Sequence, residues 1–245
     1  MKGKELQLND QQFKNAMEVF NSEWGGRGPS IPEIKVSYDD NTKRHFVIKR
    51  GEKVIDLGET IEVIILKSRN QYSLYAENKE DRVSTDEFDS FTQDVTLRKG
   101  GEPIKVAPYP EVKALIKEKY PELKFINVLY VMFKDPNDSK ASYTMHKIFI
   151  KPASRQNLWD YQASTGAKAS FSFTTKLGTD IGKKGTTTYY PITFEKVLDM
   201  DPETFKSFMV CRMDLDRDIK AQEEAAAKKP TYDSTPDFLE GLVEE

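Results

Sequence analysis

A change in the spacing of apolar residues near residue 31 constrains the fold of this chain most strongly. Apolar and polar side chains alternate over residues 31–38, again around Phe46 and Ile48, and again over residues 72–76, and a strand-length apolar segment lies over residues 61–66. A period of two is typical of strands with one buried face. Because the connections between these segments are short, the sequence predicts an antiparallel meander, the beginning of a barrel or sandwich.

Polar turns and one strongly apolar strand support this meander. Residues 39–41 and 50–53 have the composition of tight turns. Residues 61–66 are apolar enough to lie at the centre of a sheet. By contrast, residues 77–103 are polar, and we expect an excursion there with one short strand near Val95.

The remainder of the chain mixes helices with strands. Helices are expected over residues 9–21, over 110–119, from Ser154 as N-cap through Tyr161, and from about 202 towards 229. Further strands are expected over 123–133, 143–150, 168–177 and 186–194, the last two flanking a loop at 178–185. The predicted fold class is therefore mainly β, with an OB-like antiparallel barrel, added strands and peripheral helices.

The last sixteen residues differ in composition from the rest. Residues 230–245 hold five acidic side chains, two prolines and no Lys or Arg. Such a segment buries little apolar surface, so we expect a body of residues 1–229 followed by a flexible acidic tail. The chain has a net charge of -3, and without the five acidic side chains of the tail the body has +2. This near-neutral body argues against a strongly basic, chromatin-like binder.

Two roles are open for the tail. A polyanionic segment can occupy the positive surface that binds a real polyanion, or it can dock on a partner through its apolar residues Phe238 and Leu239. The plain alternative is that a charged terminus only aids solubility.

Several features indicate a reducing, cytoplasmic setting. The only cysteine, Cys211, cannot form an internal disulfide and lies in an apolar run, as a small core residue would. The longest apolar run, over 125–133, has the length of a strand and not of a membrane-spanning helix. The N-terminus lacks the apolar region of a signal peptide.

The usual motifs of enzymes and metal sites do not fit. The loop at 178–185 differs from a P-loop in its glycine spacing and has no Ser or Thr directly after a lysine. Asp214, Asp216 and Asp218 lie in a predicted helix, where alternate residues do not face one another, and they read as a solvated acidic face. His45 and His146 each lie alone within a predicted strand, so with a single cysteine a zinc site has too few ligands. Neither histidine has an obvious Ser or Cys partner for nucleophilic catalysis. We therefore expect no enzyme activity, no metal and no cofactor, and a metal-dependent nuclease is the third choice.

Basic residues mixed with aromatic residues on strands are the remaining chemical signal. Single-stranded nucleic acid is bound by cations along its phosphates and by rings that stack on its bases. The candidate nucleic-acid-binding residues are Arg27, Lys43, Arg44, Lys49, Arg50, Arg69, Tyr72, Tyr75, Lys176, Lys183, Lys184 and Tyr189. Because strand residues alternate between faces, at most one of Tyr72 and Tyr75 is expected to face a binding groove. Phe171 and Phe173 are expected in the core.

The segments 29–36, 46–48, 61–66 and 75–76 resemble the N-terminal half of phage-type single-stranded DNA-binding proteins. The resemblance implies an OB-fold core with an acidic C-terminal tail, sequence-tolerant binding of single-stranded DNA, no cofactor, and tail contacts with replication or recombination proteins. Tails of that family usually end in a dense acidic run with a terminal aromatic residue, whereas here Phe238 lies seven residues before Glu245.

The predicted function is non-enzymatic binding of single-stranded DNA in phage-like replication or recombination. The alternative is a protein-binding module or inhibitor from a mobile element, whose acidic tail mimics nucleic acid.

Overall fold

The computed structural model describes residues 31–38, 44–74, 78–136, 141–166 and 170–227. Several of the sequence predictions lie outside these residues, namely the helix over 9–21, Arg27, the turn over 39–41, Lys43, Tyr75 and the acidic tail over 230–245 with Phe238 and Leu239. The described part is mainly β with peripheral helices, so the predicted fold class is confirmed.

The predicted N-terminal meander is present as a three-stranded antiparallel sheet. It consists of β1 (Ile34–Tyr38), β2 (Arg44–Arg50) and β3 (Lys53–Gly58). The expected turn joins β2 to β3, and Gly51 there has a φ of 61°, which favours glycine. The sequence missed β3 because only Leu57 on this strand is buried, so its apolar alternation is weak.

One long strand organises the larger sheet. The prediction of two strands over 61–66 and 72–76 was wrong, because β4 runs without a break over the 14 residues Ile61–Leu74. Polar residues in its middle, among them Lys67 and Arg69, are held by partners from other elements and therefore do not end the strand. This strand pairs with β8, β10 and β5.

Five strands and one helix have the connectivity of an OB barrel. The strands are β4, β8 (Lys124–Phe133), β9 (Thr144–Ile150), β10 (Phe173–Thr179) and β13 (Ile192–Asp199), in the order β13-β10-β4-β8-β9. Counted along the chain, the first strand, β4, pairs with both the second, β8, and the fourth, β10. Helix α3 (Pro152–Thr165) connects the third strand, β9, to the fourth. The predicted pairing of 123–133 with 143–150 is confirmed. Sheet β1-β2-β3 adjoins β9 through a parallel bridge from Glu33 to Lys147.

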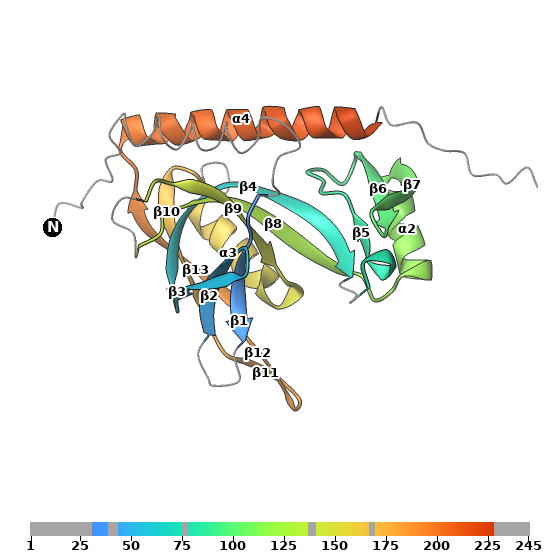
Figure 1. Cartoon of the computed structure of the whole chain (residues 1–245), viewed down its shortest axis with the longest axis horizontal. Helices are drawn as coiled ribbons and strands as arrows, with labels where there is room; N and C mark the ends of the chain where they lie inside the picture. Colours follow the sequence, from blue (N-terminus) through green and yellow to red (C-terminus); the bar gives the residue numbers. More distant parts are fainter. Residues whose placement is uncertain (1–30, 39–43, 75–77, 137–140, 167–169, 228–245) are drawn as a thin grey trace, which may run out of the picture.

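The polar excursion is a small unit of its own, which we call the insertion. It contains η1 (Lys79–Asp81), β5 (Val83–Thr85), β6 (Asp94–Lys99), β7 (Glu102–Pro108) and α2 (Tyr109–Lys119). The strand near Val95 and the helix over 110–119 are confirmed, whereas β5 and β7 were missed. Strand β7 is exposed except at Ala107, so it carries almost no apolar pattern. Figure 1 shows the insertion beside the barrel.

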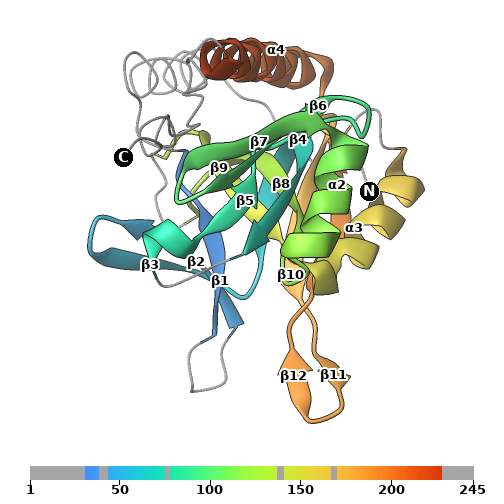
Figure 2. The same ribbon diagram turned by 90° about the vertical axis from the view of Figure 1, so that its right-hand side faces the viewer.

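A small hairpin replaces most of the predicted loop at 178–185. Strands β11 (Gly182–Lys184) and β12 (Thr187–Tyr189) pair with each other and extend the connection between β10 and β13. In Figures 1 and 2 this hairpin projects away from the barrel. The strand expected over 168–177 begins only at Phe173.

The helices confirm one prediction and correct another. Helix α4 (Pro202–Ala227) matches the expected C-terminal helix and lies along the outside of the large sheet (Figure 1). Ser154 was predicted as the N-cap of α3, but the cap is Lys151 and Ser154 lies in the first turn. There its buried hydroxyl accepts a hydrogen bond of 2.8 Å from the backbone N–H of Ile192, which ties α3 to β13. Among the described residues, no helix has the length and apolarity needed to cross a membrane.

Alternate residues of β4 and β8 enter two different cores. Val63 and Leu129 face the barrel interior, which the sheet β1-β2-β3 and α3 also fill. Ile64 and Val128 face outward and pack against α4. The buried Cys211 belongs to this second core, as expected, and Phe171 packs against it while Phe173 belongs to the first. A third core lies within the insertion.

Replacing a buried leucine on α4 tests whether this helix is an integral layer. Leu215 is 0% exposed, so Leu215→Ala should lower the free energy of unfolding by about 2–5 kcal/mol in urea titrations. Met213→Ala on the same helix is the control, because Met213 is 64% exposed and should change stability by no more than about 0.5 kcal/mol. Equal small losses for both variants would contradict a packed α4.

Candidate nucleic-acid interface

The connectivity of the barrel indicates where a ligand surface lies. In OB folds the second and third strands, together with the loops after the first and fourth strands, bind oligonucleotides and oligosaccharides. These strands correspond here to β8 and β9. The first of the two loops is the insertion, and the second is the hairpin β11–β12. Both lie at the periphery of the barrel in Figures 1 and 2.

The outward face of β4, β8 and β9 carries Lys67, Arg69 and Lys147, and each of them is paired with a carboxylate. Lys67 Nζ lies 2.6 Å from Asp216 of α4 and 2.8 Å from Asp89 of the insertion. Lys147 Nζ lies 2.6 Å from Glu87, whose other carboxylate oxygen accepts a hydrogen bond of 2.5 Å from the Tyr130 hydroxyl. A fourth carboxylate, that of Glu223, pairs with Arg69. The cations of this face are therefore neutralised by Glu87, Asp89, Asp216 and Glu223, the last two of which belong to α4.

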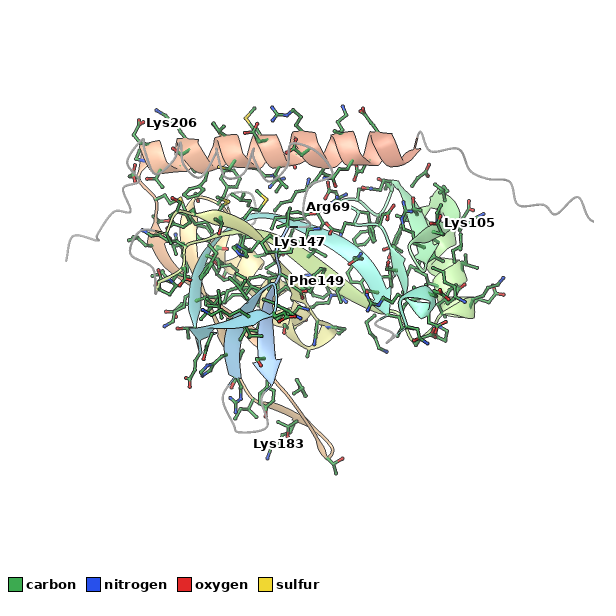
Figure 3. All side chains as sticks on the ribbon, in the orientation of Figure 1. Arg69, Lys105, Lys147, Phe149, Lys183 and Lys206 are labelled. Atoms are coloured by element: carbon green, nitrogen blue, oxygen red, sulfur yellow. The ribbon has the colours of Figure 1, made fainter. Side chains whose placement is uncertain are left out.

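Arg69, a predicted nucleic-acid contact, is part of this covered face. It is 4% exposed and pairs with Asp89 at 2.9 Å and with Glu223 at 2.5 Å. Burial disfavours the charged guanidinium, but the carboxylates of Asp89 and Glu223 outweigh it, so the pKa of Arg69 is raised above its usual value. Figure 3 shows Arg69 beneath α4. The guanidinium of Arg69 is thus occupied by ion pairs that hold α4 and the insertion to the sheet.

Tyr72 is also occupied by the interior. Its ring packs edge-on against Phe125 at 5.0 Å, and its hydroxyl lies 3.3 Å from that of Tyr109. Burial raises the pKa of Tyr72, and the hydrogen bond to Tyr109 acts in the same direction. This ring belongs to the core of the insertion, so it cannot serve as an open stacking platform without leaving that core.

An open groove lies at the base of the hairpin. Its volume is about 580 Å³, and β1, the end of β9, the start of α3 and β12 line it. Phe149, Tyr189 and Tyr190 supply its rings, and Lys151 and Lys35 supply cations. Glu33 also lines the groove, and its carboxylate lies 3.0 Å from Lys35 Nζ. Tyr189 is 37% exposed. The three rings and the cations give this groove the chemistry that bases and phosphates require.

The backbone at Gly182 makes room for Tyr189. A Cβ at Gly182 would lie 2.4 Å from two atoms of the Tyr189 ring, which is closer than any real contact. The two residues are paired in register across β11 and β12. Gly182 thus lets the Tyr189 ring lie flat across the hairpin.

Arg44 connects the groove to a second hollow. Its guanidinium lies over the Tyr190 ring, 4.3 Å from the centroid. Arg44 and Lys176 also line a hollow of about 490 Å³ together with Glu59 and Glu195. The hollow therefore holds both signs of charge, whereas the hairpin extends the positive side through the exposed Lys183.

The structure thus divides the predicted site residues into groups. Arg44 and Lys176 line the second hollow, Tyr189 lines the groove, and Lys183 lies on strand β11 of the hairpin (Figure 3). Lys49 is exposed on β2, while Arg50 and Lys184 are described for their backbone only. Sequence reasoning did not assign Phe149, Lys151 and Tyr190 to the site. Phe149 and Lys151 lie where β9 ends and α3 begins. The predicted junction between a strand and a helix was the sequence feature from which these two residues could have been proposed.

The acidic helix face differs from its prediction. Asp214, Asp216 and Asp218 do lie on a helix, but Asp216 binds Lys67 of the sheet and is not simply solvated. Arg212 also contacts Asp216, at 2.8 Å. In the described ranges, no three His, Cys, Asp or Glu residues are grouped closely enough to hold a metal ion.

Comparisons with protein-family models, curated proteins and solved structures gave no significant match.

The pairing of Asp216 predicts a pH dependence. Burial acts to raise the pKa of Asp216, but hydrogen bonds from Lys67 and Arg212 outweigh it, so the pKa is lowered. Its stabilising contribution is then present above the unfolded-state pKa of about 3.9 and is lost as pH falls through the lower folded-state pKa. The gap in free energy of unfolding between the natural chain and Asp216→Asn should therefore narrow between about pH 5 and pH 3 in urea titrations.

The control for this experiment is Asp199→Asn. Asp199 pairs with Lys196 at 2.6 Å but is 73% exposed at its side chain, so its removal should have little effect at any pH. A gap for Asp216→Asn that stays constant down to pH 3 would contradict the assigned pairing.

Proposed function

We propose that this protein binds single-stranded DNA with little sequence preference, in the groove beside the hairpin β11–β12. The observation that carries the proposal is the hairpin itself, which occupies the position of the fourth OB loop and bears Lys183 and Tyr189 next to an aromatic groove. OB folds use this loop for oligonucleotides.

The chemistry of the groove supports single strands over duplexes. Unpaired bases can leave their stack and lie on exposed rings, whereas duplex bases cannot. The groove is lined by Phe149 of β9, by Tyr189 of β12 and by Tyr190, which directly follows β12. Arg44 and Lys183 are the cations placed to meet phosphates. The resemblance to phage-type single-stranded DNA-binding proteins supports a role in replication or recombination, in the cytoplasm of a host cell.

A titration with labelled oligonucleotide tests the proposal directly. Fluorescence anisotropy of a dT oligonucleotide should rise with protein at low salt, and each phosphate contact should add about 0.7 to the slope of log K against log salt. A duplex of the same length should bind more weakly. Absence of binding at low salt would overturn the proposal and favour the protein-binding module instead.

Lys183 should contribute to binding through its charge alone. It is exposed on β11, so Lys183→Ala should leave the melting temperature unchanged and lower the salt slope by about 0.7. Lys206→Ala is the matched control, because Lys206 is an exposed lysine on α4, far from Lys183 in Figure 3. Equal slopes for the two variants would remove the hairpin from the interface.

Tyr189 should contribute by stacking. Base–aromatic stacking is worth about 1–3 kcal/mol per base, so Tyr189→Ala should weaken affinity by about 5- to 150-fold in the same titration. Ile181→Ala is the control, since Ile181 is 51% exposed just before β11 and offers no ring. If both variants bind as the natural chain does, Tyr189 serves only to pack against Gly182.

A further inference from the structure

Two exposed rings, Phe91 and Trp159, lie where the insertion meets α3, next to the buried Tyr109 and the half-buried Phe125. We call this surface the junction patch, and its residues are Phe91, Tyr109, Phe125, Arg155 and Trp159. Phe91 and Trp159 are 50% and 46% exposed, which is unusual for rings of this size. The Phe91 ring lies 4.9 Å from Tyr109 and 6.1 Å from Phe125. The patch thus joins the insertion, the start of β8 and α3.

Arg155 places a cation inside this patch. Its guanidinium carbon lies 4.2 Å from the centroid of Phe125 and 4.5 Å from that of Trp159. Its Nε is buried and has no hydrogen-bond partner among the described residues. A guanidinium has five N–H donors, and their planar fork matches the oxygens of a phosphate.

The charge of Arg155 is not neutralised in the way that other arginines of this chain are. Arg98 binds Asp86 through two nitrogens at 2.6 and 2.9 Å, and Arg69 binds two carboxylates. At Arg155 burial lowers the pKa, and the groups that oppose it are the hydroxyls of Tyr72 and Tyr109, not carboxylates. The nearest acid along the helix, Asp160, accepts a hydrogen bond from Gln156 at 2.8 Å.

Helix α3 connects the junction patch to the groove. Lys151, Ala153 and Ser154 line the groove, and Arg155 and Trp159 come next on the same helix. With a rise of 1.5 Å per residue, Lys151 and Trp159 are about 12 Å apart along the axis. A strand that leaves the groove past Lys151 is therefore within reach of the patch.

We infer that the junction patch is a second stacking site for the same bound strand, with Arg155 meeting its phosphate and Trp159 and Phe91 its bases. The inference rests on the proposed function and extends the interface from the hairpin to the insertion. Nucleic acid fits better than an acidic peptide, because half-exposed rings offer faces to bases and the guanidinium among them offers donors to phosphate.

Trp159 itself provides the measurement. The chain has two tryptophans, and the other, Trp24, lies outside the described residues. In a full-length Trp24→Phe protein, Trp159 is the only tryptophan, so its fluorescence reports a base stacked on it. A dT oligonucleotide of about 16 nucleotides, the upper end of OB site sizes, should quench this fluorescence in parallel with the anisotropy of the labelled strand.

Variants at Arg155 complete the test. Arg155→Gln should weaken binding at least about fivefold and reduce the quenching, while Arg155→Lys should restore only part of the affinity because the planar donors are lost. Lys105→Gln is the control, as Lys105 is an exposed cation on β7 of the insertion (Figure 3). Melting curves of all variants establish that they are folded.

The outcomes separate the two proposals. Quenching that Arg155→Gln reduces and Lys105→Gln leaves unchanged supports the junction patch. Rising anisotropy without any change in Trp159 fluorescence overturns the patch and leaves the groove intact. Absence of both signals overturns the proposed function itself. Equal quenching by a poly-glutamate peptide at the same concentration would overturn the assignment to nucleic acid and make the patch an acidic-peptide site.

Discussion

Two shielded cations on β4 determine how the parts of this protein fit together. Lys67 and Arg69 lie in the middle of the long strand, and both are largely removed from solvent. Burying a charge without a partner costs several kcal/mol, so their carboxylate partners are required for the folded state. Those partners come from the insertion, at Asp89, and from α4, at Asp216 and Glu223. The same ion pairs therefore position both additions on the barrel.

This arrangement determines which surface is left for a ligand. A carboxylate beside a cation occupies the position that a phosphate would need, so the face under α4 is closed to a polyanion. Among the described residues, cations without a carboxylate partner include Lys183 on the hairpin and Arg155 on α3. The proposed path of the strand thus runs along one side of the barrel and not across the centre of its sheet.

The sequence predicted the elements whose apolar residues alternate or face one core. Strands β1, β2, β8 and β9 belong to this class, and so does α4 with its buried stripe. Strands β3 and β7 were not predicted, because each buries a single residue, Leu57 or Ala107, and therefore shows almost no apolar alternation. The polar middle of β4 was taken for a break between strands, since its partners lie far along the chain.

Distance along the chain also explains why the ion pairs of Arg69 could not be predicted from the sequence. Its two carboxylate partners are 20 and 154 residues away, so nothing near it in the chain reveals that its charge is neutralised. Arg155 is the opposite case, because an acidic residue, Asp160, lies close to it in the sequence but accepts a hydrogen bond from Gln156. The guanidinium of Arg155 lies over the rings of Phe125 and Trp159 instead. An arginine beside aromatic residues is thus ambiguous in sequence. Only the positions of the carboxylates decide whether it holds the fold together or remains open to a ligand, and in this protein both cases occur beside the insertion.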